Sequence, residues 1–156
     1  MPTDNPLALD RQLCFALYSG EKAVSAAYRE LLGPLGLTYP QYLVMLALWE
    51  EDGQPVSGLG RRLGLDSGTL SPLLKRLESA GHLRRDRDAA DERVVRARLT
   101  AAGAALRRDA LPVPGELFAR MGLDPAEAAE LGRLLGKICS TGRAAAAQAP
   151  RGKDAP

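Results

Sequence analysis

The segment from Asp66 to Thr100 reads DSGTLSPLLKRLESAGHLRRDRDAADERVVRARLT, and its pattern determines which architecture the chain can adopt. In its first half, leucines recur at three- and four-residue spacing, which predicts a helix over about 67–80. Asp66 or Ser67 suits the N-cap of this helix, because both side chains accept hydrogen bonds from helix amides. A start one turn later, at Ser71-Pro72, is the alternative.

The second half of the segment predicts a β-hairpin. Alternating and β-branched residues favour strands over 83–87 and 93–99, and the polar loop 88–92 joins them. A shorter helix, about 58–63 with Ser57 as its cap, precedes the longer one. Two helices followed by a basic hairpin are typical of a winged helix-turn-helix. In that fold the second helix enters the major groove of DNA, and the wing reaches the backbone or the minor groove.

Further helices flank this unit on both sides. They share apolar residues at helical spacing and are predicted at about 9–32, from Thr38 with a capping box, from Thr100 to about 110, and from Asp124 until the chain frays at Thr141. Proline and glycine predict a turn at 53–55 and a break in the chain at 112–115.

These elements predict a mainly α fold with a small β-hairpin wing. We expect the winged DNA-binding domain to span 35–111. The helical segments 7–34 and 112–147 carry apolar stripes that so small a domain cannot cover, so we expect them to form a homodimer interface. A dimer places two reading helices on half-sites about 34 Å apart, which predicts a pseudo-palindromic operator. The tails, 1–6 and 148–156, are expected to be disordered.

Composition argues against several classes of protein. The longest apolar run is far shorter than the about 20 residues of a membrane span, and the N-terminus lacks the apolar region of a secretory signal. Two distant cysteines therefore indicate free thiols in a reducing cytoplasm. The single histidine, His82, offers little to a metal site or a catalytic triad, and we assign it no role. We expect no membrane, no metal and no cofactor.

The net charge of +2 conceals a basic centre. Residues 61–98 hold ten Lys and Arg against six acidic residues, whereas the rest of the chain holds 11 basic and 13 acidic residues. Such a face suits double-stranded DNA, although an ordinary solvated surface is the simpler alternative. The side chains expected at the DNA are Ser67, Thr69, Ser71, Lys75 and Arg76 on the second helix, and Arg84 and Arg85 on the wing.

Cys14 lies in the first turns of the predicted N-terminal helix, where the helix dipole favours a thiolate. Peroxides oxidise an accessible thiolate to a sulfenic acid. All four tyrosines fall between residues 18 and 42, and a phenol hydroxyl donates a hydrogen bond that stabilises a thiolate. Tyr28 is about 21 Å from Cys14 along one helix, so it can contact only the Cys14 of a partner chain. The alternative is that these residues belong to an ordinary core.

Residues 91–100, DERVVRARLT, resemble the wing signature of the MarR family of regulators. The resemblance implies that Arg93 enters the minor groove and that Asp91 orients it. Residues 12–19, 37–43 and 65–77 are similar to the organic hydroperoxide repressor (OhrR) branch of that family. This narrower resemblance implies that Tyr28 and Tyr39 hold the reactive thiolate of Cys14 across the subunit boundary, and that organic hydroperoxide is the inducer.

Cys139 departs from those relatives that have a resolving cysteine, which carry it soon after the DNA-binding domain, near residues 117–119, where this chain has none. We therefore favour a scheme in which a small cellular thiol traps oxidised Cys14, and Cys139 is the candidate resolving cysteine of the alternative scheme. The prediction is a redox-sensing repressor, not an enzyme, that leaves its operator when Cys14 is oxidised. Two hypotheses compete with it: a MarR-type regulator that responds to a small aromatic or lipophilic ligand, and a thiol peroxidase that consumes hydroperoxides with Cys14.

Overall fold

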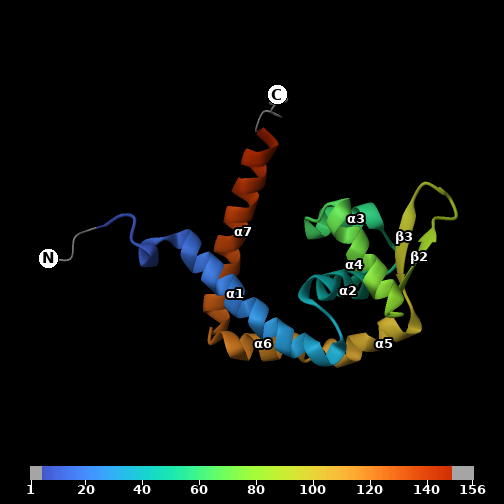
Figure 1. Cartoon of the computed structure of the whole chain (residues 1–156), viewed down its shortest axis with the longest axis horizontal. Helices are drawn as coiled ribbons and strands as arrows, with labels where there is room; N and C mark the ends of the chain where they lie inside the picture. The colour runs from blue at the N-terminus through green and yellow to red at the C-terminus, as the bar shows by residue number, and fades with distance from the viewer. Residues whose placement is uncertain (1–4, 149–156) are drawn as a thin grey trace. The chain divides into compact units, whose positions relative to one another are not determined.

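The structure, a computed structural model, describes residues 5–148 and confirms a mainly helical fold with a small antiparallel sheet (Figure 1). In chain order the elements are η1 (Leu9–Arg11), α1 (Leu13–Leu32), η2 (Gly33–Leu35), α2 (Tyr39–Glu50), β1 (Gln54–Pro55), α3 (Val56–Leu63), α4 (Ser67–Ser79), β2 (Leu83–Arg87), β3 (Val95–Leu99), α5 (Ala101–Ala110), α6 (Val113–Met121) and α7 (Pro125–Gln148).

The chain divides after Arg120 into two compact units, and α7 makes up most of the second. Of the two tails that the sequence predicts to be disordered, residues 1–4 and 149–156 lie outside the described range. No single described helix is long and apolar enough to cross a membrane, although the bent pair of Leu13–Leu35 and Tyr39–Glu50 meets that criterion together.

Helix α2 is the centre of the first unit. It begins with the predicted capping box, in which the Gln41 side chain accepts a hydrogen bond of 2.8 Å from the backbone N–H of Thr38. Its side chains Tyr42, Val44, Met45 and Leu48 are at most 1% exposed. A helix that is apolar nearly all round has to be covered on most sides, and the neighbouring elements do this except at Leu46, which is exposed.

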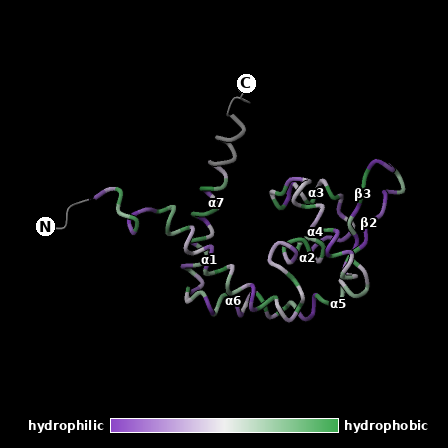
Figure 2. Tube along the Cα trace, in the orientation of Figure 1, coloured by the Kyte–Doolittle hydropathy of each residue, from purple (hydrophilic) through white to green (hydrophobic). Residues whose placement is uncertain are grey.

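Helix α4, the expected recognition helix, packs on α2 through one apolar face. Its leucines Leu70, Leu74 and Leu77 are buried together with Leu59 of α3 and Leu83 of β2. Burial of each such side chain contributes about 1.5–3 kcal/mol, so the face is held firmly. Hydrophobic stretches follow α2 and α4 in Figure 2, whereas the hairpin of β2 and β3 is mostly hydrophilic. The polar face of α4 therefore remains open.

The sheet contains one strand more than the hairpin predicted from the sequence. Its strand order is β1-β3-β2, and all pairs are antiparallel. Of the segment predicted as a turn at 53–55, Gly53 does turn the chain with a positive φ, but Gln54 and Pro55 form β1 and pair with Ala97 and Arg96. Proline is tolerated there because β1 is an edge strand. The second hairpin strand begins at Val95, two residues later than predicted, because Val94 closes the loop through a bond from its N–H to the carbonyl of Asp91.

Four helix boundaries differ from the prediction. The helix predicted from about residue 9 begins at Leu13, because Gln12 is extended and separates α1 from the short turn η1. Helix α3 begins at Val56 with Pro55 as its N-cap, so Ser57 lies inside the helix and is not the cap. The predicted break at 112–115 is only a turn, because α6 starts at Val113 and Pro114 occupies its second position, where a missing N–H costs nothing. Helix α7 continues to Gln148 and does not fray at Thr141.

Two other boundaries are where the sequence placed them. Helix α4 begins at Ser67, so the later start at Ser71-Pro72 is wrong and Pro72 lies inside the helix. Helix α7 begins after Asp124, whose carboxylate accepts hydrogen bonds from the N–H groups of Ala126 and Glu127 at 2.8 and 2.9 Å.

Candidate nucleic-acid interface and redox site

The N-terminus of α4 is fixed by its cap. The carboxylate of Asp66 accepts a bond of 2.8 Å from the Thr69 N–H and one of 3.2 Å from the Thr69 hydroxyl. These bonds, that from the Thr69 N–H foremost, lower the pKa of Asp66. The Thr69 hydroxyl is thus engaged by the cap.

The exposed face of α4 forms one wall of a shallow surface depression. It is lined by Ser67, Gly68, Ser71, Pro72 and Lys75 of the helix and by Arg85 of β2. The structure thus brings together four of the predicted DNA-contacting residues from two elements. Arg76, further along α4, is exposed but does not line this depression. Small hydroxyls beside two cations are suited to phosphate oxygens and base edges.

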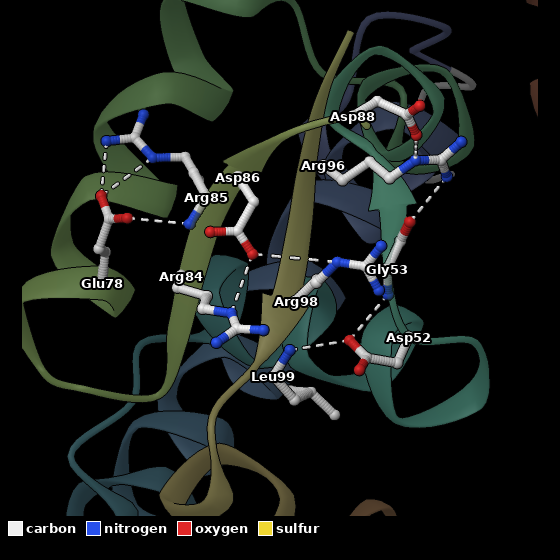
Figure 3. Close-up of polar contacts among 10 residues, drawn as sticks. All are labelled: Asp52, Gly53, Glu78, Arg84, Arg85, Asp86, Asp88, Arg96, Arg98 and Leu99. Atoms are coloured by element: carbon white, nitrogen blue, oxygen red, sulfur yellow. Dashed lines mark hydrogen bonds and ion pairs between the residues drawn. The ribbon is translucent and has the colours of Figure 1, made fainter. Parts of the chain in front are cut away.

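Arg85 is anchored to α4. Its backbone N–H donates to Oε1 of Glu78 at 3.0 Å, and its guanidinium donates to Oε2 through Nε at 3.0 Å and Nη2 at 2.7 Å (Figure 3). The side-chain bonds from Arg85, followed by the backbone bond, lower the pKa of Glu78. Strand β2 is therefore fixed against the reading helix, and Arg85 shares its charge with a carboxylate.

The outer face of the hairpin carries further cations. Arg84 lies 2.9 Å from Asp86, and Asp86 lies 3.9 Å from Arg98 on the neighbouring strand (Figure 3). The side chain of Arg84 is 65% exposed. Exposed ion pairs of this kind are weak, so Arg84 remains available to an approaching phosphate.

The tip of the wing presents Arg93. Its Nε and Nη2 donate to the two oxygens of Asp91 at 3.0 and 3.3 Å, and its backbone N–H donates to Oδ1 at 3.1 Å. Hydrogen bonds from the Arg93 side chain, and then from its backbone, lower the pKa of Asp91. The Arg93 side chain is still 90% exposed. The pairing that the sequence suggested is thus present, with the cation turned outward.

The aromatic side chains gather between α1 and α2. The ring of Tyr28 stacks on that of Tyr39, with centroids 4.2 Å apart, and lies 6.0 Å from the ring of Tyr42. Burial, followed by the neighbouring phenols Tyr39 and Tyr42, raises the pKa of Tyr28 to about 12. Tyr28 therefore keeps its proton at neutral pH and can donate a hydrogen bond.

Both thiols are free and exposed. Cys14 is the second residue of α1, and Cys139 lies on α7 in the other compact unit. Cys14 and Tyr28 lie on the same continuous helix, about 21 Å apart along its axis. Within a single chain, therefore, Cys14 does not contact the paired phenols of Tyr28 and Tyr39.

Sequence reasoning missed the acidic partners of the wing. Glu78, Asp88 and Asp52 look like ordinary surface acids, and no spacing rule marks their partners in β2 and β3. The imidazole Nδ1 of His82, to which the sequence assigned no role, is buried without a hydrogen-bond partner among the described residues. Within residues 5–148 no cluster of three or more His, Cys, Asp or Glu side chains is arranged to hold a metal ion.

Comparison with known proteins gives a consistent match. The model of the MarR family matches residues 37–95. The chain is 58% identical over 111 residues to the transcriptional regulator TtmR of Methylorubrum extorquens, a match that covers 70% of this chain and only 57% of TtmR. It is 45% identical over 112 residues to the organic hydroperoxide resistance transcriptional regulator of Bacillus subtilis, which covers 72% of this chain and 76% of that protein. Among solved structures it is similar to reduced AbfR bound to DNA, with a TM-score of 0.75 and 34% identity over 86% of this chain and 92% of that one.

Proposed function

Because this chain belongs to the MarR family of DNA-binding transcriptional regulators, we propose that it is a repressor whose release from DNA is triggered when organic hydroperoxide oxidises Cys14. The observation that carries this proposal is the stacked pair Tyr28 and Tyr39 in a chain whose Cys14 is exposed at the start of α1. The likeness to the organic hydroperoxide regulator of Bacillus subtilis supports it.

The proposed sensor needs two copies of the chain. The phenols of one copy lie too far along α1 from their own Cys14, so they serve the Cys14 of the partner. Exposed apolar side chains on α1 and α7 support an interface between copies, among them Leu13, Phe15, Leu131, Leu135 and Ile138. Such stripes are rarely left in water. The dimer would read a pseudo-palindromic operator with two reading helices.

The proposed chemistry is a two-electron oxidation of sulfur. The Cys14 thiolate attacks one peroxide oxygen, so an S–O bond forms and the O–O bond breaks. The alkoxide that leaves takes a proton and departs as an alcohol. A small cellular thiol then attacks the sulfenic acid, which yields a mixed disulfide and water. Both products carry an added group on the Cys14 sulfur, which then no longer accepts the phenol hydrogen bonds as the thiolate did.

DNA release follows from that change at the sulfur. Tyr28 lies on α1 and Tyr39 opens α2, the helix on which the winged domain is built. When the sulfur no longer accepts their hydrogen bonds and needs more room, the winged domains of the dimer shift as bodies. A shift of a few ångströms takes the two reading helices off their half-site spacing.

The deciding experiment is a DNA-binding titration of the reduced protein with and without an organic hydroperoxide. The wild type is expected to release its operator on oxidation, and Cys14→Ser is expected to stay bound. Cys139→Ser is the control and is expected to release DNA as the wild type does. A Cys139→Ser protein that no longer responds would replace the small-thiol scheme by a bridge between Cys14 and Cys139.

A second candidate rests on an open depression of about 480 Å³ between α2, α5 and α6. It is lined mainly by apolar side chains, including Leu46, Trp49 and Leu111, together with the charged side chains of Glu50 and Arg107. An apolar floor beside a cation suits a small aromatic acid, since the carboxylate of Glu50 in the lining is paired with Arg62. Under this alternative the ligand releases DNA from Cys14→Ser as readily as from the wild type.

A further inference from the structure

Arg96 differs from the other cations of the wing, because its guanidinium is used inside the domain. It lies on β3, the middle strand of the sheet. Its Nε donates to the carboxylate of Asp88 in the wing loop, and its Nη1 donates to the backbone carbonyl of Gly53 at 2.9 Å (Figure 3). One side chain thereby ties the loop at the tip of the hairpin to the connection between α2 and β1.

At the tip, Asp88 holds the loop that carries Arg93. Its Oδ1 accepts hydrogen bonds from the N–H groups of Ala90 at 2.8 Å and Asp91 at 3.2 Å. Its own N–H donates to the carbonyl of Val94 at 2.8 Å. The bond from Arg96, followed by those of the loop amides, lowers the pKa of Asp88 to about 2. The carboxylate thus stays charged and bonded throughout the physiological range.

At the other end, Gly53 is itself immobilised. Asp52 Oδ1 accepts hydrogen bonds from the N–H of Gly53 at 2.7 Å and from the N–H of Leu99 at 2.8 Å. Gly53 has a positive φ of 72°, which a larger residue adopts only with strain. A β-carbon at Gly53 would also lie 2.9 Å from the guanidinium of Arg98. The carbonyl that receives Arg96 is therefore a fixed point.

We propose that Arg96 and Asp88 form a wing latch, a positioning pair that sets the direction in which Arg93 is presented to DNA, and that Arg96 does not itself bind phosphate. The side chain of Arg96 is only 33% exposed and that of Asp88 15%, against 90% for Arg93. The proposal rests on the DNA-binding function above and adds to it a residue that specifies the geometry of the wing.

For the change in DNA affinity on Asp88→Asn, the latch predicts the opposite sign to that expected from charge alone. Asp88→Asn removes a negative charge from a surface that faces a polyanion, which by itself strengthens DNA binding. The same change keeps an oxygen for the loop amides but turns an amide donor toward the guanidinium, so it opens the latch. The bond lost joins two charged groups, and without it the loop no longer holds Arg93 in one direction. We expect this loss to lower the affinity for DNA about tenfold.

Glu92 provides the matched control. It lies in the same loop, is exposed, and has no hydrogen bond or ion pair in the part of the chain that the structure describes. Glu92→Gln removes the same charge without opening the latch. The probe is the duplex that the reduced wild-type protein recovers from a pool of randomised duplexes, titrated at several salt concentrations.

We expect Asp88→Asn to bind this duplex about tenfold more weakly, whereas Glu92→Gln binds as tightly as the wild type or more tightly. Arg96→Ala is expected to weaken binding while the slope of log affinity against log salt stays that of the wild type. A phosphate contact would instead reduce that slope by about one. Asp88→Asn binding like Glu92→Gln, or a reduced slope for Arg96→Ala, would overturn the latch.

A second measurement does not depend on DNA. Nitrogen-15 relaxation of the wing loop should show lower order parameters at residues 89–93 in Asp88→Asn but not in Glu92→Gln. Equal order in both variants would contradict the latch. The two proposals fail separately, because a wild-type protein that keeps its DNA under hydroperoxide disproves the redox function and leaves these comparisons intact.

Discussion

Gly103 is the residue whose replacement should disturb the first unit most for its size. It is buried in the first turn of α5, and its N–H donates to the hydroxyl of the capping Thr100 at 3.0 Å. A β-carbon there would lie 1.8 Å from the backbone carbonyl oxygen of His82. The carbonyl would have to retreat by more than 1 Å to reach even 3.0 Å, and real β-carbons essentially never come closer than that.

The cost of Gly103→Ala follows from the bonds at this contact. The indole N–H of Trp49 donates to the Gly103 carbonyl at 2.8 Å, and the Thr100 N–H donates to the His82 carbonyl at 3.1 Å. A partly buried donor left without its partner costs about 1–3 kcal/mol, and the second bond contributes about 1 kcal/mol. Alanine returns at most about 1 kcal/mol through its helix propensity. With that full return subtracted, the free energy of unfolding should fall by about 1–3 kcal/mol.

The assay is thermal unfolding of the reduced protein followed by fluorescence. Trp49 is the single tryptophan of the chain, so its emission reports on this contact directly. A loss of about 1–3 kcal/mol lowers Tm by roughly 2–12 °C for a chain of this length. Gly115→Ala is the control, because Gly115 lies in α6 and a β-carbon there meets nothing within 4 Å. It should raise stability slightly, and equal melting of the two variants would refute the reasoning.

The remaining predictions concern the wing, the dimer and pH. Arg93→Ala should weaken operator binding by about 1–3 kcal/mol and reduce the salt slope by about one without lowering Tm, and an unchanged titration would contradict its place at the DNA. Leu135→Asp on the apolar stripe of α7 should abolish folded dimer in sedimentation, whereas Ala129→Asp on the opposite side of that helix should not; a stable monomeric Leu135→Asp protein would argue against the interface. Folding lowers the pKa of Asp88 to about 2. In urea titrations, the difference in unfolding free energy between the wild type and Asp88→Asn should therefore be constant at pH 6–8 and shrink only as the pH falls from about 4 towards 2. A difference that vanished already near pH 6 would exclude this carboxylate as the cause.

Local sequence patterns anticipated much of the winged unit. The Asp66 cap and the capping box of Thr38 and Gln41 join residues three positions apart, whereas the contact between Asp91 and Arg93 was expected from the resemblance to the MarR wing. Contacts of this range follow from the spacing of residue types, because they form within one turn of the chain and do not depend on the tertiary fold.

Longer contacts were not predictable in the same way. Strand β1 has two residues, and its pairing with Ala97 depends on a partner far along the chain. Helix α6 was missed because Pro112 and Pro114 suggest a break, although proline is also favoured in the first turn of a helix. Arg85 anchors β2 to α4 through Glu78, and Arg96 bridges the wing loop and Gly53. No residue pattern distinguishes these arginines from those that face solvent.

The two bonds accepted by Asp52 have a mechanical consequence. Asp52 lies two residues after the end of α2, and its bond from the N–H of Leu99 joins this segment to the last residue of β3, so the hairpin is a lever arm whose pivot is the segment after α2. The five residues of β3 span about 16 Å at about 3.3 Å per residue. A rotation of α2 by roughly 10° therefore sweeps the far end of β3 through about 3 Å, which is the length of a hydrogen bond. A small rotation of α2 is thus amplified at the far end of β3. Under the proposed redox function, a mutation that loosens this pivot should weaken DNA release on oxidation before it lowers stability.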